Sequence, residues 1–190
     1  FSDDHPYITE AYKGAEKAVK SLLKQLDITE EKVSEKKFKS GGVLQIPKEL
    51  YQTPAEKEKN RQAYTELAKM HGEQYKLLSV KNEHGKKNPD ALNLNTGYYS
   101  DMKNPQTDNG KNAIQAAIKG ASRQQVGEVY IYLEKEYPRS SIYAGLKAAL
   151  QGDRAKAIKD IIIRFPGGEI KRYEADKLRE ALKNIGDKNR

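Results

Sequence analysis

The sequence contains no cysteine, no tryptophan and no long hydrophobic run. Without cysteine, a disulfide framework, thiolate metal sites and cysteine nucleophiles are all excluded. The longest aliphatic run is Ile161-Ile162-Ile163, far short of the roughly 18 apolar residues that indicate a membrane-spanning helix. We therefore expect no transmembrane segment, and this run is typical of a buried strand.

Several catalytic signatures are also missing. There is no Walker loop, no GxGxxG after a strand, no GxSxG and no HExxH. Nucleotide-dependent motors, dehydrogenases and the common hydrolases therefore lose support. Because the chain begins at Phe1 rather than methionine, we expect it to be a fragment or a processed product of a larger parent.

The composition is polar and basic. The chain has 190 residues, of which 36% are hydrophobic and 33% charged, enough for one domain with a core, or for a core plus a helical arm. Lysine and arginine total 35 against 27 acidic residues, for a net charge of +8. This balance favours a nucleic-acid partner, because it raises the local concentration of polyanions. A merely soluble basic protein is the alternative.

The first 50 residues differ in pattern from the rest. Residues 6–26 have apolar positions at helical spacing and predict a helix. Residues 27–40 form a charged stretch that Gly41-Gly42 interrupts, which is typical of a linker or extension. We therefore expect an N-terminal helical arm and linker over residues 1–50 and a second domain over residues 51–190.

The remaining sequence alternates between helix and strand patterns. A helix is predicted to begin at Thr53-Pro54, where Thr53 can cap and Pro54 can occupy the first turn. The segments that follow predict strands over 75–80, 90–95, 97–103, 126–133, 158–165 and 169–174, and helices over 111–125, 140–151 and 175–185. This order predicts an α/β fold, with a mixed central sheet flanked by helices.

Two carboxylates and a lysine are predicted to converge on this sheet. Side chains alternate faces along a strand, so Asp101 and Lys103 point the same way and Met102 the other way. If residues 90–95 and 97–103 pair through the Asn95-Thr96-Gly97 turn, Asp90 comes close to Asp101 and Lys103. The three charged side chains would then meet at one edge of the sheet.

Such a cluster suits phosphodiester cleavage. Two carboxylates can bind a hard divalent ion such as Mg²⁺, which polarises a phosphoryl oxygen and lowers the pKa of a bound water. A nearby lysine can orient or deprotonate that water, or neutralise charge in the transition state. The hypothesis is a divalent-metal site at Asp90 and Asp101, with Mg²⁺ first and Mn²⁺ or Zn²⁺ as alternatives. An exposed charge set without function is the competing interpretation.

Pro89-Asp90 followed by Asp101-Met102-Lys103 resembles the PD-(D/E)xK nuclease pattern. The wider segments KNPDALNLNTGYYSDMKNPQ, KNAIQAAIKGASRQ and VGEVYIYL resemble the C-terminal toxin domains of the CdiA contact-dependent growth-inhibition type, over roughly residues 55–185. The resemblance implies a tRNA nuclease at the end of a secreted or cell-surface protein. It also implies delivery into a target-cell cytoplasm and a cognate immunity protein as partner.

The resemblance also implies roles for individual residues. Asp90 would be the first metal-ligating acid, Asp101 would take the second acidic position, and Lys103 would be the catalytic lysine. The family often places a further glutamate on the preceding helix. In this sequence Gln62 is expected at that position, and Glu56 and Glu66 are the nearby acids.

The helix after the cluster offers candidate substrate contacts. Lys111 and Gln124 would contact phosphates near the site if its polar face binds nucleic acid. The competing interpretation is the solvated face of an amphipathic helix.

Two other functions remain open. The same cluster could cleave DNA rather than RNA. Alternatively, the chain could be a non-catalytic nucleic-acid-binding or interaction module of a mobile element or phage protein, in which the basic surface binds without cleavage.

Overall fold

The computed structural model describes residues 6–25, 33–48, 54–79 and 87–188. The chain divides into two compact units, Phe1–Lys32 and Val33–Arg190. In the first unit, helix α1 (Pro6–Gln25) confirms the predicted N-terminal helix. Its described side chains are exposed, including Tyr12, Val19 and Leu22.

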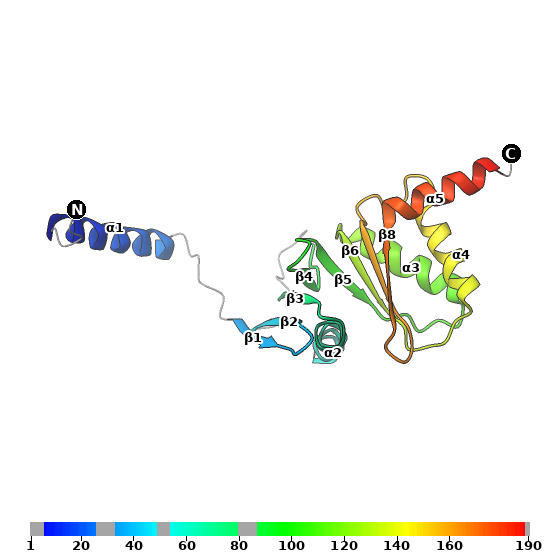
Figure 1. The fold of residues 1–190 in the computed structure, drawn as a ribbon, viewed down its shortest axis with the longest axis horizontal. Helices are drawn as coiled ribbons and strands as arrows, with labels where there is room; N and C mark the ends of the chain where they lie inside the picture. The colour runs from blue at the N-terminus through cyan, green and yellow to red at the C-terminus, as the bar shows by residue number, and fades with distance from the viewer. Residues whose placement is uncertain (1–5, 26–32, 49–53, 80–86, 189–190) are drawn as a thin grey trace. The chain divides into compact units, whose positions relative to one another are not determined.

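The second unit is built on one mixed sheet whose strands lie side by side in chain order. The strands are β1 (Val33–Lys37), β2 (Val43–Pro47), β3 (Gln74–Leu77), β4 (Ala91–Asn93), β5 (Tyr99–Lys103), β6 (Glu128–Tyr132), β7 (Asp160–Arg164) and β8 (Ile170–Glu174). The pairs β2–β3, β5–β6 and β6–β7 are parallel, and the other pairs are antiparallel. Figure 1 shows this arrangement.

Helices cover both faces of the sheet. They are α2 (Pro54–His71), α3 (Gly110–Arg123), α4 (Arg139–Leu150) and α5 (Ala175–Lys188). Helix α2 packs on one face, whereas α3, α4 and α5 pack on the other. The predicted mixed α/β fold with an N-terminal helix is therefore confirmed.

The two faces have different cores. On the α3–α5 face, alternate residues of β6 and β7 bury aliphatic side chains such as Ile131, Ile161 and Ile163. On the α2 face the largest buried side chains are tyrosines: Tyr64 lies 5.0 Å from Tyr75 and 5.5 Å from Tyr130 between ring centroids. The period-2 alternation along each strand separates the two sets.

Residues 33–47 form a strand pair rather than the expected extension. Gly41 adopts a φ of +88°, which allows the turn between β1 and β2. Strand β2 then pairs with β3, with Leu44 opposite Tyr75. Strand β1 is polar and almost wholly exposed, so only its pairing with β2 makes it a strand. The two compact units divide between residues 32 and 33, and the domain boundary expected at 50/51 stays a prediction.

Within the part of the chain that the structure describes, none of the helices has the length and apolar character needed to cross a membrane. The predicted cap residue Thr53 lies outside the described residues.

Candidate active site

The β4–β5 hairpin brings Asp90 beside the start of β5. Ala91 pairs with Ser100, and the amide of Asp90 donates to the carbonyl of Ser100 at 3.0 Å. Gly97 has a φ of +75°, and its amide donates to the carbonyl of Asn93 at 2.9 Å to close the turn. The predicted hairpin is therefore confirmed, and the turn chemistry at Gly97 is what allows it.

Asp90 is held from two directions. Its Oδ2 accepts a hydrogen bond from the amide of Met102 at 2.8 Å, and its Oδ1 accepts one from Nδ2 of Asn60, on α2, at 3.0 Å. Burial raises the pKa of Asp90 to about 8, and a hydrogen bond with Asp101 and the charge of Asp101 act in the same direction. The Asp90 and Asp101 carboxyl groups therefore interact electrostatically across the hairpin, so that the charge of one disfavours the charge of the other.

Lys103 completes the cluster from the other side. Its Nζ lies 2.9 Å from Oδ2 of Asp101, and Asp101 is only 4% exposed. A buried carboxylate oxygen is costly unless a cation compensates it. The ammonium of Lys103 supplies that positive charge at Oδ2 of Asp101.

Helix α3 packs closely against Lys103. A Cβ at Gly120 would lie 3.2 Å from Cε and 3.4 Å from Nζ of Lys103. The missing side chain at Gly120 therefore leaves room for the lysine to lie against Asp101. The sequence pattern placed Gly120 on the helix but did not indicate this contact.

The contribution of α2 comes from Asn60, not from Gln62. Gln62 is exposed, whereas Asn60 lies one turn before Tyr64, which is fully buried. Positions i and i+4 share a helix face, so Asn60 points toward the sheet and Gln62 away from it. The burial of Tyr64 is the signal from which this orientation could have been inferred.

Of the two acids near Gln62, Glu66 binds elsewhere: its Oε1 accepts from Nε of Arg164 at 2.7 Å and its Oε2 from the hydroxyl of Tyr132 at 3.0 Å. The side chain of Glu56 lies outside the described residues. Among the described side chains of α2, the neutral amide of Asn60 is the group that binds Asp90.

The structure separates the two candidate substrate contacts on α3. Lys111 is exposed at the start of the helix, about 14 Å along the axis from Gly120 at 1.5 Å per residue. Gln124 caps the other end of α3 and is half-buried, roughly one turn beyond Gly120. Gln124 is thus the nearer of the two to Lys103, and its role in substrate binding stays a prediction.

A buried polar network supports the cluster from the α2 face. Glu128 is fully buried and accepts hydrogen bonds from Nδ2 of Asn93 at 2.8 Å and from the hydroxyl of Tyr75 at 2.9 Å. The Ser100 hydroxyl lies 2.9 Å from the hydroxyl of Tyr64. Burial raises the pKa of Glu128, while its hydrogen bonds with Ser100, Asn93 and Tyr75 oppose that rise. The sequence pattern did not indicate this network.

The donor set fits a hard cation with a small number of protein ligands. Within the described ranges, no group of three or more His, Cys, Asp or Glu side chains is arranged to hold a metal ion. Two neighbouring carboxylates suit Mg²⁺, which prefers oxygen ligands, keeps several of its waters and needs only one or two protein carboxylates. They suit Zn²⁺ less, because neither histidine nor cysteine is present among these ligands.

Comparison with known proteins singles out the same part of the chain. Residues 86–170 match the family model described as "Contact-dependent growth inhibition CdiA C-terminal domain". This segment is similar to CdiA C-terminal domains. The match includes all three residues of the Asp90–Asp101–Lys103 cluster, but 85 of 190 residues is less than half of the chain. It supports the resemblance to CdiA C-terminal domains without indicating a nuclease type.

A solved structure with a related fold comes from the same system. The chain is similar to one described as "CdiA-CT/CdiI toxin and immunity complex from Burkholderia pseudomallei", with a TM-score of 0.50 and 18% identity. The likeness covers 68% of this chain and 98% of that one. At this identity it shows a shared CdiA-CT fold. No curated protein matches the chain.

Proposed function

We propose that this chain is the toxin part of a larger secreted or cell-surface protein and that it cleaves tRNA in a reaction that depends on a divalent metal. The convergence of Asp90, Asp101 and Lys103 carries the proposal. The similarity to CdiA C-terminal domains supports the toxin role and delivery into a target-cell cytoplasm. The net charge of +8 supports a polyanionic substrate.

Each residue of the cluster has a distinct role in the proposal. Asp90 and Asp101 would hold a divalent ion, which supplies Lewis-acid stabilisation of the phosphoryl oxygens. Lys103 lies against Asp101 and is 32% exposed at its side chain, so its ammonium can reach both the carboxylate and a substrate phosphate. It would orient the attacking water and neutralise charge that develops on the phosphoryl group.

Asn60 would act as a positioning residue. Its amide donates to Oδ1 of Asp90, and the amide of Met102 donates to Oδ2. These two bonds fix the plane of the Asp90 carboxylate. A carboxylate fixed in this way would be held ready to ligate the metal, because hydrogen bonds to a ligand orient it.

A cognate immunity protein is the proposed partner, because the similar CdiA-CT chain was solved as a complex with one. An acidic protein surface over the catalytic cluster would both block the substrate and match the charge of this chain. Co-purification or isothermal titration with a candidate immunity protein tests this partner.

The decisive experiment incubates the chain with total tRNA and, separately, with plasmid DNA, each with Mg²⁺ and with EDTA. We expect tRNA cleavage that EDTA abolishes, and a loss of about 10²- to 10⁴-fold in rate for Lys103→Met, the range expected for removing a general acid–base or charge-stabilising group. Circular dichroism should show that the variant remains folded.

The outcomes discriminate between the candidate functions. Cleavage of plasmid DNA alone would make the enzyme a deoxyribonuclease with the same cluster. Undiminished cleavage in both Lys103→Met and Asp90→Ala would refute the assigned residues. Intact substrates after long incubation with Mg²⁺ or Mn²⁺, together with salt-dependent binding, would establish a non-catalytic nucleic-acid-binding module.

A further inference from the structure

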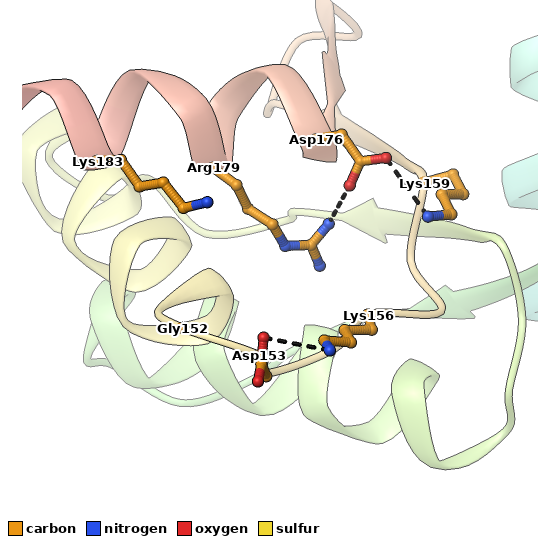
Figure 2. Close-up of a pocket in the computed structure, with 7 residues that line it drawn as sticks. All are labelled: Gly152, Asp153, Lys156, Lys159, Asp176, Arg179 and Lys183. Carbon is orange, nitrogen blue, oxygen red and sulfur yellow. Dashed lines mark hydrogen bonds and ion pairs between the residues drawn. The ribbon is translucent and has the colours of Figure 1, made fainter.

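A second basic feature lies apart from the Asp90–Asp101–Lys103 cluster. The loop after α4 and the first turns of α5 enclose a pocket with a volume of about 340 Å³. Its charged lining consists of Asp153, Lys156, Lys159, Asp176, Arg179 and Lys183. Figure 2 shows Arg179 and Lys183 projecting from α5 and Lys156 from the facing loop. We call this the α5 pocket.

The α5 pocket has a rigid cation at its base. The guanidinium of Arg179 donates to the carbonyl of Ala155 at 2.7 Å and to Oδ1 of Asp176 at 2.8 Å. It also donates to the carbonyls of Ile158 and Arg154, at 3.4 and 3.3 Å. The side chain is only 13% exposed. Arg179 therefore shapes the loop, and we assign it a structural role in the pocket.

The lysines around Arg179 are available to a ligand. Lys156 and Lys159 lie 3.2 and 3.4 Å from carboxylate oxygens of Asp153 and Asp176, and Lys183 is 3.8 Å from Glu180. All three side chains are at least 44% exposed. Such exposed ion pairs contribute little stability and exchange readily for a stronger anion. The pocket has two more cations than carboxylates, which favours a phosphate group.

The α5 pocket lies on the same side of the sheet as the catalytic cluster. Ser100, Glu128 and Asp160 are in register on neighbouring strands. Ser100 and Asp160 are therefore two strands apart, or roughly 10 Å across the sheet at about 4.8 Å per strand. Asp101 directly follows Ser100, and Lys159 directly precedes Asp160. Helices α3 and α5 both cover the face to which Asp101 points.

The chain between the two sites is also basic. The carbonyl of Gly127 accepts hydrogen bonds from the amides of Lys159 and Asp160, at 2.7 and 3.0 Å. Arg123 ends α3 four residues before Gly127 and is exposed. Arg123 is therefore an exposed cation on the last turn of α3, three residues after Gly120, which packs against Lys103.

We infer that the α5 pocket binds a backbone phosphate of the nucleic-acid substrate, a few nucleotides from the bond held at the catalytic cluster. The inference rests on the proposed function for the identity of the substrate. It adds a second point of attachment, which would fix the direction of the strand across the active site. Loss of the phosphate contact in the α5 pocket should weaken substrate binding, and the residues around the cleaved bond should stay unchanged.

The test compares two triple variants with the same change in charge. One is Lys156→Gln/Lys159→Gln/Lys183→Gln in the α5 pocket. The control is Lys36→Gln/Lys37→Gln/Lys39→Gln, at exposed positions on and beside β1. Both are made in the Lys103→Met background, so that labelled tRNA stays intact, and binding is followed by fluorescence anisotropy at several salt concentrations.

We expect the pocket variant to bind tRNA about tenfold or more weakly. The slope of its logarithmic salt dependence should flatten by roughly 0.7–0.9 for each phosphate that the protein no longer neutralises. The control should change by less than about twofold, because it removes only long-range attraction that salt screens. With Lys103 restored, the pocket variant should raise KM for tRNA cleavage and keep kcat near the wild-type value.

Several results would overturn the inference. Equal decreases in tRNA affinity in the two triple variants would show that the lower net charge, and not the α5 pocket, weakens binding. Unchanged tRNA affinity in the pocket variant would refute a substrate contact and leave the pocket to an acidic protein partner. Pocket-dependent binding of inorganic phosphate, measured by calorimetry without any effect on tRNA, would make it a site for free phosphate only.

Failure of the proposed nuclease function gives a different result from failure of the α5-pocket inference. If the unmodified chain cleaves neither RNA nor DNA, the nuclease assignment fails, while the anisotropy comparison still decides the α5 pocket. Single substitution Lys183→Gln, at a side chain 72% exposed, repeats the comparison with the least effect on folding.

Discussion

The two faces of the sheet pack against their helices with different chemistry, and the Asp90–Asp101–Lys103 cluster contacts helices from both faces. The α3–α5 face is aliphatic, with Ile131, Ile161 and Ile163 fully buried. The α2 face buries Tyr75, Tyr130 and the carboxyl group of Glu128. An aliphatic core stabilises through area and close packing, whereas a polar core orients side chains through hydrogen bonds and is costly when one of them is broken.

The same difference between the two faces is found within the Asp90–Asp101–Lys103 cluster. Asp101 and Lys103 point to the α3–α5 face, where Gly120 packs against the lysine. Asp90 is held from the α2 side by Asn60. We interpret the aliphatic side as the source of stability and the polar side as the source of precise orientation, and three experiments test that comparison.

The largest effect is expected on the aliphatic face. Ile131→Ala removes a fully buried side chain and leaves a cavity between β6 and the helices, at a cost of about 2–5 kcal/mol in the free energy of unfolding. Tyr75→Phe removes one donor to Glu128 and should cost less, about 1–3 kcal/mol. Urea denaturation of both variants measures the difference.

A larger cost for Tyr75→Phe than for Ile131→Ala would reverse the comparison and make the polar network the main source of stability.

The second effect concerns the orientation of Asp90. Asn60→Ala removes the donor to Oδ1 and should lower kcat by about 10- to 100-fold, the range for residues that orient metal ligands. KM should change little, because Asn60 does not reach the substrate in this arrangement. Steady-state kinetics on tRNA measures both constants.

Gln62→Ala is the matched control, because Gln62 lies on the same helix and is exposed. Equal activity of the Asn60→Ala variant and the Gln62→Ala control would remove Asn60 from the site.

The smallest effect is a pH dependence of stability. Burial raises the pKa of Glu128 in the folded protein above its unfolded value of about 4.3, so the folded state favours the protonated form. Its stabilising contribution is complete below that unfolded value and is lost as the pH rises through the folded pKa. Glu128→Gln, which stays neutral, should therefore gain stability relative to wild type as the pH rises.

The gain should increase steadily as the pH rises. Urea denaturation at about pH 5 and about pH 8 measures it. A difference in stability that is independent of pH would show that the hydrogen bonds to Glu128 outweigh the cost of its burial.

The predictable parts of this fold are those in which local pattern and tertiary contacts agree. The runs that contain Ile114, Tyr130 and Ile162 have strong periodicity, and each forms the predicted element. Asp90, Asp101 and Lys103 could be placed together because the pattern predicts the hairpin between the two acids. Their assignment as catalytic residues stays a prediction until mutants are assayed.

The missed parts depend on partners distant in sequence. Strand β2 has only Leu44 and Ile46 as alternating apolar positions, too short a pattern to recognise, and β1 is polar. Pairing with β3, across α2, is what makes both of them strands. The choice between Asn60 and Gln62 is likewise set by which helix face meets the tyrosine core.

By itself, the sequence determined the basic charge, the absence of cysteine chemistry, the long helices and the hairpin that carries the two acids, because each depends on composition or on residues near one another in the chain. Only the tertiary structure decided that Asn60 supports Asp90, that Gly120 makes room for Lys103, and that cations from a loop and from α5 surround one pocket. Those arrangements depend on distances between segments that local periodicity does not encode.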